Sequence, residues 1–181
     1  NVFSFSLGTD YRTRLQTSTA RLRQWLANLG AEADPALPGF AFADTAPAGG
    51  PGSGASIAYP AQVVWSYDAP SGRYLRTIAG AAHLDAATGQ QLSAANVIVQ
   101  TLPHEATDYV EDSLGTTSIR IVTVGEGPVT ILRDGVAIQG VWRAGDAGMP
   151  EFVDDAGQPI PLKPGNSWIQ VVAPGDAVTV G

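Results

Sequence analysis

The pattern of apolar and polar positions changes from a helical to a strand period after the first 30 residues. Within residues 18–28 and just beyond, apolar side chains recur at Leu22, Trp25, Leu26 and Leu29. This is the spacing of one face of an α-helix. We therefore predict a helix over residues 18–28 whose apolar face is buried.

Capping residues flank this helix. A hydroxyl of Thr17, Ser18 or Thr19 can accept a hydrogen bond from the first free amides of the helix, and Gly30 suits the left-handed residue that closes it. These caps predict where the helix begins and ends.

The composition then shifts to Ala, Gly, Pro and Ser, and residues 46–56 have the sequence APAGGPGSGAS. This stretch has neither a helical nor a strand period, which predicts a loop or linker over residues 46–61. It divides the chain into residues 1–45, which hold the helix, and a β-rich domain over residues 62–181.

Beyond the linker, short runs of β-branched and aromatic residues alternate with turn residues, which is typical of strands. Asp134-Gly135 suits a tight type I′ hairpin, and Ser71-Gly72 suits a second hairpin turn. The predicted fold class is α+β, mainly β, with a short N-terminal helical segment before an antiparallel β-sandwich or barrel-like domain. The predicted strands cover residues 62–67, 73–78, 96–102, 118–124, 129–133, 136–142, 167–172 and 177–180.

Charge and composition exclude several classes of function. The 181 residues include 10 Lys and Arg against 17 Asp and Glu, so the net charge of -7 leaves no basic surface for nucleic acid. The absence of cysteine excludes disulfides, thiolate zinc sites and a cysteine nucleophile. No apolar stretch approaches the roughly 20 residues of a membrane-spanning helix, so we expect no membrane span within the chain.

A series of motifs carries a resemblance to a known family. The order of these motifs resembles the YerB-like bacterial lipoprotein family, which contains domain of unknown function 3048. The motifs are Tyr74-x-Arg76, Gly80-x-x-His83-x-Asp85, Thr88-Gly89-x-Gln91-Leu92-x-x-x-Asn96-Val97-Ile98-Val99, Gly125-x-Gly127, Asp134-Gly135, Gly140-x-Trp142-Arg143, Asp155-x-Gly157 and Pro164-Gly165-x-x-Trp168.

The resemblance implies a setting but no reaction. It covers roughly the last two thirds of the chain, and the helix resembles the last helix of the family's N-terminal α/β domain, so residues 1–45 are expected to be a remnant of that domain. It implies an extracytoplasmic protein of the bacterial cell envelope, lipid-anchored or secreted. The N-terminal domain of the same protein is then an expected partner of this chain.

His83 and Asp85 form the first candidate site. Residues two apart on an extended segment point to the same side, where a carboxylate can orient an imidazole as a general base. In this hypothesis Asn96 or Arg76 steadies a developing anion. The alternative is that His83 and Asp85 fix a turn by hydrogen bonds, together with Thr88-Gly89 and Asn96.

We expect neither a metal nor a cofactor. His83, Asp85, His104 and Asp108 lack the ligand spacing of a zinc site, because the two histidines are 21 positions apart. No Gly-x-Ser-x-Gly nucleophile elbow and no nucleotide-binding glycine loop occurs in the sequence.

Large aromatic side chains form the second candidate site. Most such residues fill the interior of a small β domain, but an exposed pair would suit stacking on a cell-wall glycan. The candidates are Trp65, Tyr67, Tyr74, Trp142 and Trp168.

Two functional hypotheses follow, together with a structural one. The first is a non-catalytic envelope module that binds a glycan, a peptide or an envelope protein. The second is an envelope hydrolase or transferase that uses His83 and Asp85. The chain can also be chiefly structural and pack against the expected N-terminal domain.

Overall fold

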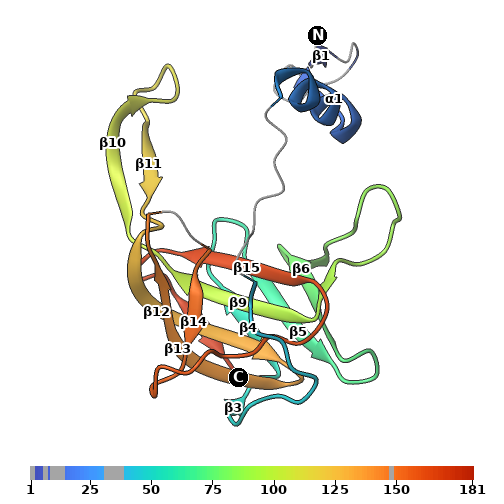
Figure 1. Cartoon of the computed structure of the whole chain (residues 1–181), viewed down its shortest axis with the longest axis vertical. Coiled ribbons are helices and arrows are strands. Elements are labelled where there is room, and N and C mark those ends of the chain that lie inside the picture. Colours follow the sequence, from blue (N-terminus) through green and yellow to red (C-terminus); the bar gives the residue numbers. More distant parts are fainter. Residues whose placement is uncertain (1–2, 6–7, 9–14, 31–38, 147–148) are drawn as a thin grey trace. The chain divides into compact units, whose positions relative to one another are not determined.

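The computed structural model describes residues 3–5, 8, 15–30, 39–146 and 149–181 (Figure 1). The chain forms two compact units, which consist of residues 1–37 and residues 38–181. We call them unit 1 and unit 2. Among the described residues, no helix is long and apolar enough to span a membrane.

Unit 1 contains the predicted helix, α1 (Thr19–Leu29), and a short antiparallel pair, β1 (Ser4–Phe5) and β2 (Leu15–Gln16). The helix begins where the Ser18 side chain accepts a hydrogen bond from the Arg21 amide. It ends at Gly30, whose left-handed φ of 62° closes the last turn. The helix and both caps are confirmed.

The expectation that the apolar face of α1 is buried is wrong for the described part of unit 1. No residue of the helix is buried, and Trp25 and Leu29 are 46% and 58% exposed. The physical reason is that a helix face is buried only by a second layer. Within the described residues, unit 1 has only the two-residue strands β1 and β2 besides α1.

Unit 2 contains two six-stranded sheets, neither closed into a barrel. The first sheet has the order β14 (Glu151–Val153), β13 (Val136–Ala144), β12 (Gly125–Arg133), β9 (Asn96–Thr101), β15 (Ser167–Val172), with β3 (Gly50–Pro51) paired to β13. The second has the order β16 (Val178–Val180), β4 (Gly54–Ile57), β5 (Val63–Asp68), β6 (Arg73–Ile78), β7 (Ala81–Ala82), with β8 (Ser93–Ala94) paired to β6.

The strand pairing confirms the mainly β fold class, with one departure from an antiparallel arrangement. β9 and β15 pair in parallel, while the other named strand pairs among the described residues are antiparallel. All eight predicted strands lie within or overlap strands of the structure. The hairpin between β12 and β13 turns at Asp134 and Gly135, whose φ values of 52° and 75° are those of the predicted turn.

The first sheet is covered on both faces. One face packs against the second sheet, where Trp65, Tyr74, Val97 and Leu132 contribute to a shared core. The other face carries Ile98, Ile131 and Trp142, which pack with Phe152, Ile160 and Leu162. Burial on both faces explains why β9 has three consecutive apolar residues, Val97, Ile98 and Val99, where a half-exposed strand would alternate.

The prediction of a loop or linker over residues 46–61 differs from the structure, which places β3 and β4 there. β4 is an internal strand between β16 and β5, and Ala55 and Ile57 are buried in the core. The small residues permit close packing: a Cβ on Gly54 would lie 2.2 Å from the Trp65 carbonyl oxygen. The position of β4 is therefore specified by packing against Trp65 and not by a run of β-branched residues.

A separate two-stranded ribbon extends from unit 2. β10 (His104–Val110) pairs with β11 (Thr117–Ile121) and with no other named strand of the described residues. Figure 1 shows this ribbon standing clear of the two sheets.

Candidate functional site

Arg76 occupies a core-facing position of β6. Alternate residues of a strand share a face, and Tyr74 and Arg76 are the buried pair on this strand. Arg76 is only 7% exposed and lies opposite Trp65 on β5. Its guanidinium carbon is 4.9 Å from the ring centroid of Trp168 and 5.8 Å from that of Trp65. These are cation–π distances between two aromatic rings.

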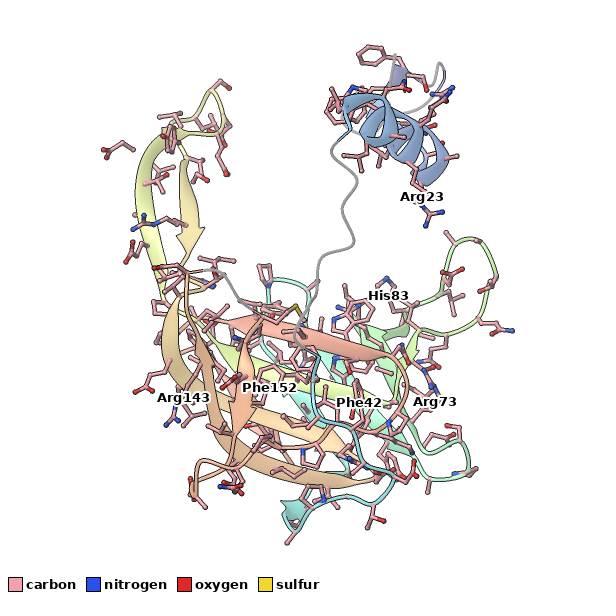
Figure 2. All side chains as sticks on the ribbon, viewed as in Figure 1. Arg23, Phe42, Arg73, His83, Arg143 and Phe152 are labelled. Atoms are coloured by element: carbon pink, nitrogen blue, oxygen red, sulfur yellow. The ribbon has the colours of Figure 1, made fainter. Side chains whose placement is uncertain are left out.

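Among the described residues, the guanidinium of Arg76 has one side-chain hydrogen-bond partner. Its Nη1 contacts Nδ1 of His83, which follows β7 at the edge of the second sheet (Figure 2). Because a guanidinium only donates, Nδ1 accepts and the ring proton lies on Nε2. The buried Nε of Arg76 donates no hydrogen bond, and no described Asp or Glu forms an ion pair with Arg76. We call Arg76, His83, Trp65 and Trp168 the Arg76 cluster.

Hydrogen bonds to residues of β15 hold the rings of Trp65 and Tyr59. The Trp65 indole donates to Gln170 Oε1 at 3.1 Å, and Gln170 Nε2 donates to the Tyr59 hydroxyl at 3.2 Å. Tyr59 in turn donates to the carbonyl of Val171. Burial lowers the pKa of Arg76, since desolvation opposes its charged form.

Asp85 belongs to its own turn and not to His83. Its Oδ1 accepts hydrogen bonds from the Ala87 amide at 2.9 Å, the Thr88 amide at 2.8 Å and the Thr88 hydroxyl at 3.0 Å. Hydrogen bonds from Thr88 and Ala87 lower the pKa of Asp85. No hydrogen bond or ion pair joins Asp85 to His83, so the predicted catalytic pair is not formed in this arrangement.

Asn96 anchors the segment before β15. Its Oδ1 accepts from the Lys163 amide at 2.7 Å, while its Nδ2 donates to the Lys163 carbonyl at 2.9 Å and to the Ser167 hydroxyl at 3.0 Å. Of the four candidate catalytic residues, the hydrogen bonds therefore join only Arg76 and His83. A hydrolase or transferase site built from these residues requires all four side chains to converge, and these hydrogen bonds do not join them.

The sequence analysis did not predict a partly buried charged network near Asn96. Asp134 accepts from the fully buried Arg133 at 3.0 Å and from Lys163 at 2.6 Å, and Lys163 also donates to the Gly72 carbonyl at 2.9 Å. The sequence feature that could have predicted it is Arg133, because a charged residue at the end of an apolar run needs a partner when it is buried. This network ties the β12–β13 turn to the β5–β6 turn.

We expect Asp134→Asn to flatten the acid limb of the stability curve of unit 2. Burial raises the pKa of Asp134, but hydrogen bonds and charges of Lys163 and Arg133 outweigh it and hold the pKa below its usual value. A lowered folded-state pKa stabilises the fold above the unfolded value of about 4, and this contribution is lost as pH falls through the folded value.

Urea unfolding of the wild type and of Asp134→Asn at a series of pH values below 5 measures this effect. Asparagine tolerates the positive φ of 52° at this position, so the turn is retained. Asp155→Asn is the control, since Asp155 is exposed and forms no ion pair with another described residue. An acid limb of equal slope in wild type and Asp134→Asn would contradict the prediction.

The candidate aromatic residues are mostly interior. Trp65, Tyr74 and Trp142 are fully buried, while Tyr67 and Trp168 are partly exposed. Tyr67 packs on Tyr74 with ring centroids 5.1 Å apart, and Trp168 packs on Trp65 at 5.4 Å. The five therefore form no common exposed platform in this structure.

No cluster of three or more His, Asp or Glu able to hold a metal occurs among the described residues. His104 and Asp108, which the sequence analysis weighed as ligands together with His83 and Asp85, both lie on β10.

Comparison with known proteins identifies the family. Residues 55–169 match the sequence family of the DUF3048 C-terminal domain, which is a domain of unknown function. The chain belongs to this family. The resemblance inferred from the sequence motifs is confirmed, and the family description assigns no reaction.

One solved structure supports the fold of this DUF3048 chain. The crystal structure of YerB from Bacillus subtilis matches with a TM-score of 0.76 and 18% sequence identity, and the match covers 98% of this chain and 59% of YerB. At this identity the likeness shows the fold alone. The chain thus spans less than two thirds of the length of YerB. No curated protein matches the chain significantly.

Proposed function

We propose that this chain is a non-catalytic binding module of the bacterial cell envelope, which docks a protein partner through the β10–β11 ribbon. The observation that carries the proposal is the exposure of apolar side chains on this ribbon. Tyr109, Leu114 and Ile119 are 78%, 90% and 62% exposed, and neither core cluster includes a ribbon residue.

The register gives the ribbon an apolar face and a polar face. Ala106 lies opposite Ile119 and His104 opposite Ile121, so both isoleucines share one face. The other face carries Glu105, which lies opposite Arg120 and forms an ion pair with it. A two-stranded ribbon with one uncovered apolar face is marginal in water. A partner that covers the face would stabilise it, as exposed apolar patches commonly mark interaction sites.

Charge selects the kind of partner. Residues 104–121 contain four carboxylates, Glu105, Asp108, Glu111 and Asp112, against the single Arg120. Two copies of this ribbon would bring like charges together, and an anionic membrane surface would repel it. A protein surface that is apolar at its centre and rich in Lys and Arg at its rim is complementary in both respects.

Binding is favoured over catalysis because Asp85 serves its own turn and Asn96 anchors Lys163, so neither joins His83. The extracytoplasmic setting is part of the proposal. It is supported by the resemblance to the YerB-like lipoproteins, and a lipid-anchored or secreted protein would present the ribbon to other envelope proteins.

The partner can be trapped by a photo-crosslinking amino acid at position 114 of the full-length protein in the bacterium that encodes it. The matched control carries the same group at Ala87, which is also exposed on a loop of unit 2. We expect a protein adduct at position 114 that the control lacks. An adduct formed only with a second copy, with lipid or with glycan would overturn the proposal.

The affinity of the purified partner then tests the chemistry. Ile119→Ser with Ile121→Ser is expected to weaken binding at least tenfold, because both side chains lie on the apolar face, while the thermal midpoint of unit 2 stays near the wild-type value. Affinity should also fall with added salt, because acidic residues meet a basic rim. Unchanged affinity in the double variant would contradict docking through the ribbon.

A further inference from the structure

We propose that the Arg76 cluster is a binding site for a carboxylate group of a small ligand. The site is independent of the β10–β11 ribbon, so its test does not depend on the proposed function. Arg76 supplies the charge, His83 orients the guanidinium, and Trp65 and Trp168 stack beside it.

The first argument is an unbalanced charge. Arg76 is only 7% exposed, yet no described Asp or Glu forms an ion pair with it. A buried charge without a counter-charge is costly, and an apolar side chain of similar size would usually serve the fold as well. The other buried arginine of the described residues, Arg133, forms an ion pair with the carboxylate of Asp134. Unlike Arg133, Arg76 therefore has no carboxylate partner among the described residues, and a bound anion would supply one.

The second argument is the geometry of the donors that remain. His83 takes Nη1, while neither Nε nor Nη2 makes a hydrogen bond in the described structure. Nε and Nη2 lie on one edge of the guanidinium and point in parallel, which is the edge that binds a planar carboxylate through two hydrogen bonds. The contact with His83 therefore leaves the bidentate edge unused.

The charge of the site favours a monoanion over phosphate. A single guanidinium is neutralised by one carboxylate, whereas a phosphate dianion would leave a buried negative charge. Nε is buried, and the partly exposed ring of Trp168 lies 4.9 Å from the guanidinium carbon, so we expect ligand entry to require movement of this ring. The carboxylate can come from a free organic acid, a peptide C-terminus or an acidic sugar.

Titrations followed by NMR distinguish these sources. The indole N–H signals of the 181-residue chain report on the site, with acetate, N-acetylglycine and glucuronate as carboxylates, inorganic phosphate as the alternative anion and acetamide as the neutral isostere. We expect a saturable shift of the Trp65 and Trp168 signals with at least one carboxylate and none with acetamide. No saturable shift with any carboxylate, or tighter binding of phosphate, would overturn the proposal.

Two substitutions locate the effect. Arg76→Met keeps much of the volume and removes the charge, and Arg76→Lys keeps the charge but removes the bidentate edge. Both are expected to weaken carboxylate binding at least tenfold, whereas the control Arg143→Met, on an exposed surface pair, leaves it unchanged.

The thermal midpoint separates a ligand site from a purely structural arginine. The carboxylate should raise the midpoint of the wild type and not that of Arg76→Met, because only a protein that binds the ligand is stabilised by it. Without ligand, Arg76→Met should melt at or above the wild-type temperature. Equal shifts and affinities in wild type and Arg76→Lys would refute the assignment.

Discussion

Replacement of Arg133 by alanine is expected to lower the free energy of unfolding of unit 2 by about 3 to 5 kcal/mol, because it removes a fully buried guanidinium that pairs with a carboxylate. Arg133 is fully buried and donates to Asp134 Oδ2 at 3.0 Å, to the Pro161 carbonyl at 2.9 Å and to the Ala43 carbonyl at 2.8 Å. Removal of the guanidinium leaves these acceptors without their donor, and it also leaves a cavity.

The matched control is Arg143→Ala. Arg143 also forms an ion pair, with Glu126 at 3.2 Å, but both side chains are more than half exposed. A surface pair contributes at most about 1 kcal/mol, so the midpoint in urea should barely move. Urea unfolding followed by circular dichroism measures both variants. Equal destabilisation of the two would show that Arg133 does not hold residues 43 and 161 in place through its buried contacts.

The parts of the fold that local chemistry decides were predictable from sequence. The Asp134-Gly135 turn needs two positive φ values, and few residue pairs tolerate them, so the turn and its two flanking strands followed directly. The caps of α1 were predictable for the same reason, since Ser18 and Gly30 act within a few residues of themselves.

Elements that depend on distant packing were not predictable. The glycine and alanine residues of β4 have low strand propensity, and only the approach of Trp65 makes them an internal strand. The polar sequence of β10 likewise gave no strand period, and its pairing with β11 defines it. The apolar period of α1 predicted a buried face, but such a period does not identify the element that would pack against that face.

In the candidate site too, local contacts were predictable from sequence and contacts between distant strands were not. His83 and Asp85 are two apart on the chain, but Thr88 and Ala87 lie closer to the Asp85 carboxylate as donors, so the turn interpretation of Asp85 accounts for its contacts. Arg76 was named only as a helper to a developing anion. Its burial opposite Trp65 and beneath Trp168 arises from the pairing of β5 with β6 and the packing of two sheets, which no local pattern encodes.

The two proposed sites use different parts of one scaffold. In the Arg76 cluster Gln170, itself bonded to Tyr59, holds the Trp65 ring, and a side chain already fixed reduces the entropy lost when a ligand binds. The β10–β11 ribbon lies outside both cores, so its sequence can vary without cost to the fold. A substitution in one proposed site is therefore expected to leave the other unchanged.

Trp142→Ala is the second substitution with a large expected effect, a loss of about 3 to 5 kcal/mol in the free energy of unfolding of unit 2. Trp142 is fully buried in the core on the outer face of the first sheet, and its indole donates to the Thr101 carbonyl at 2.7 Å. Gly127 lies opposite on β12, where a Cβ would approach the indole nitrogen to 2.8 Å. The ring thus fills a space that no neighbour can take over.

Two further variants separate the volume of the ring from its hydrogen bond. Trp142→Phe keeps an aromatic ring but leaves the Thr101 carbonyl without its donor, so it should cost about 1 to 3 kcal/mol. Trp25→Ala removes the same side chain from a site that is 46% exposed on α1, and the transition of unit 2 should not move. If Trp142→Phe were as destabilising as Trp142→Ala, the hydrogen bond to β9 and not the packing of the ring would dominate, because the phenyl ring restores most of the volume that alanine lacks.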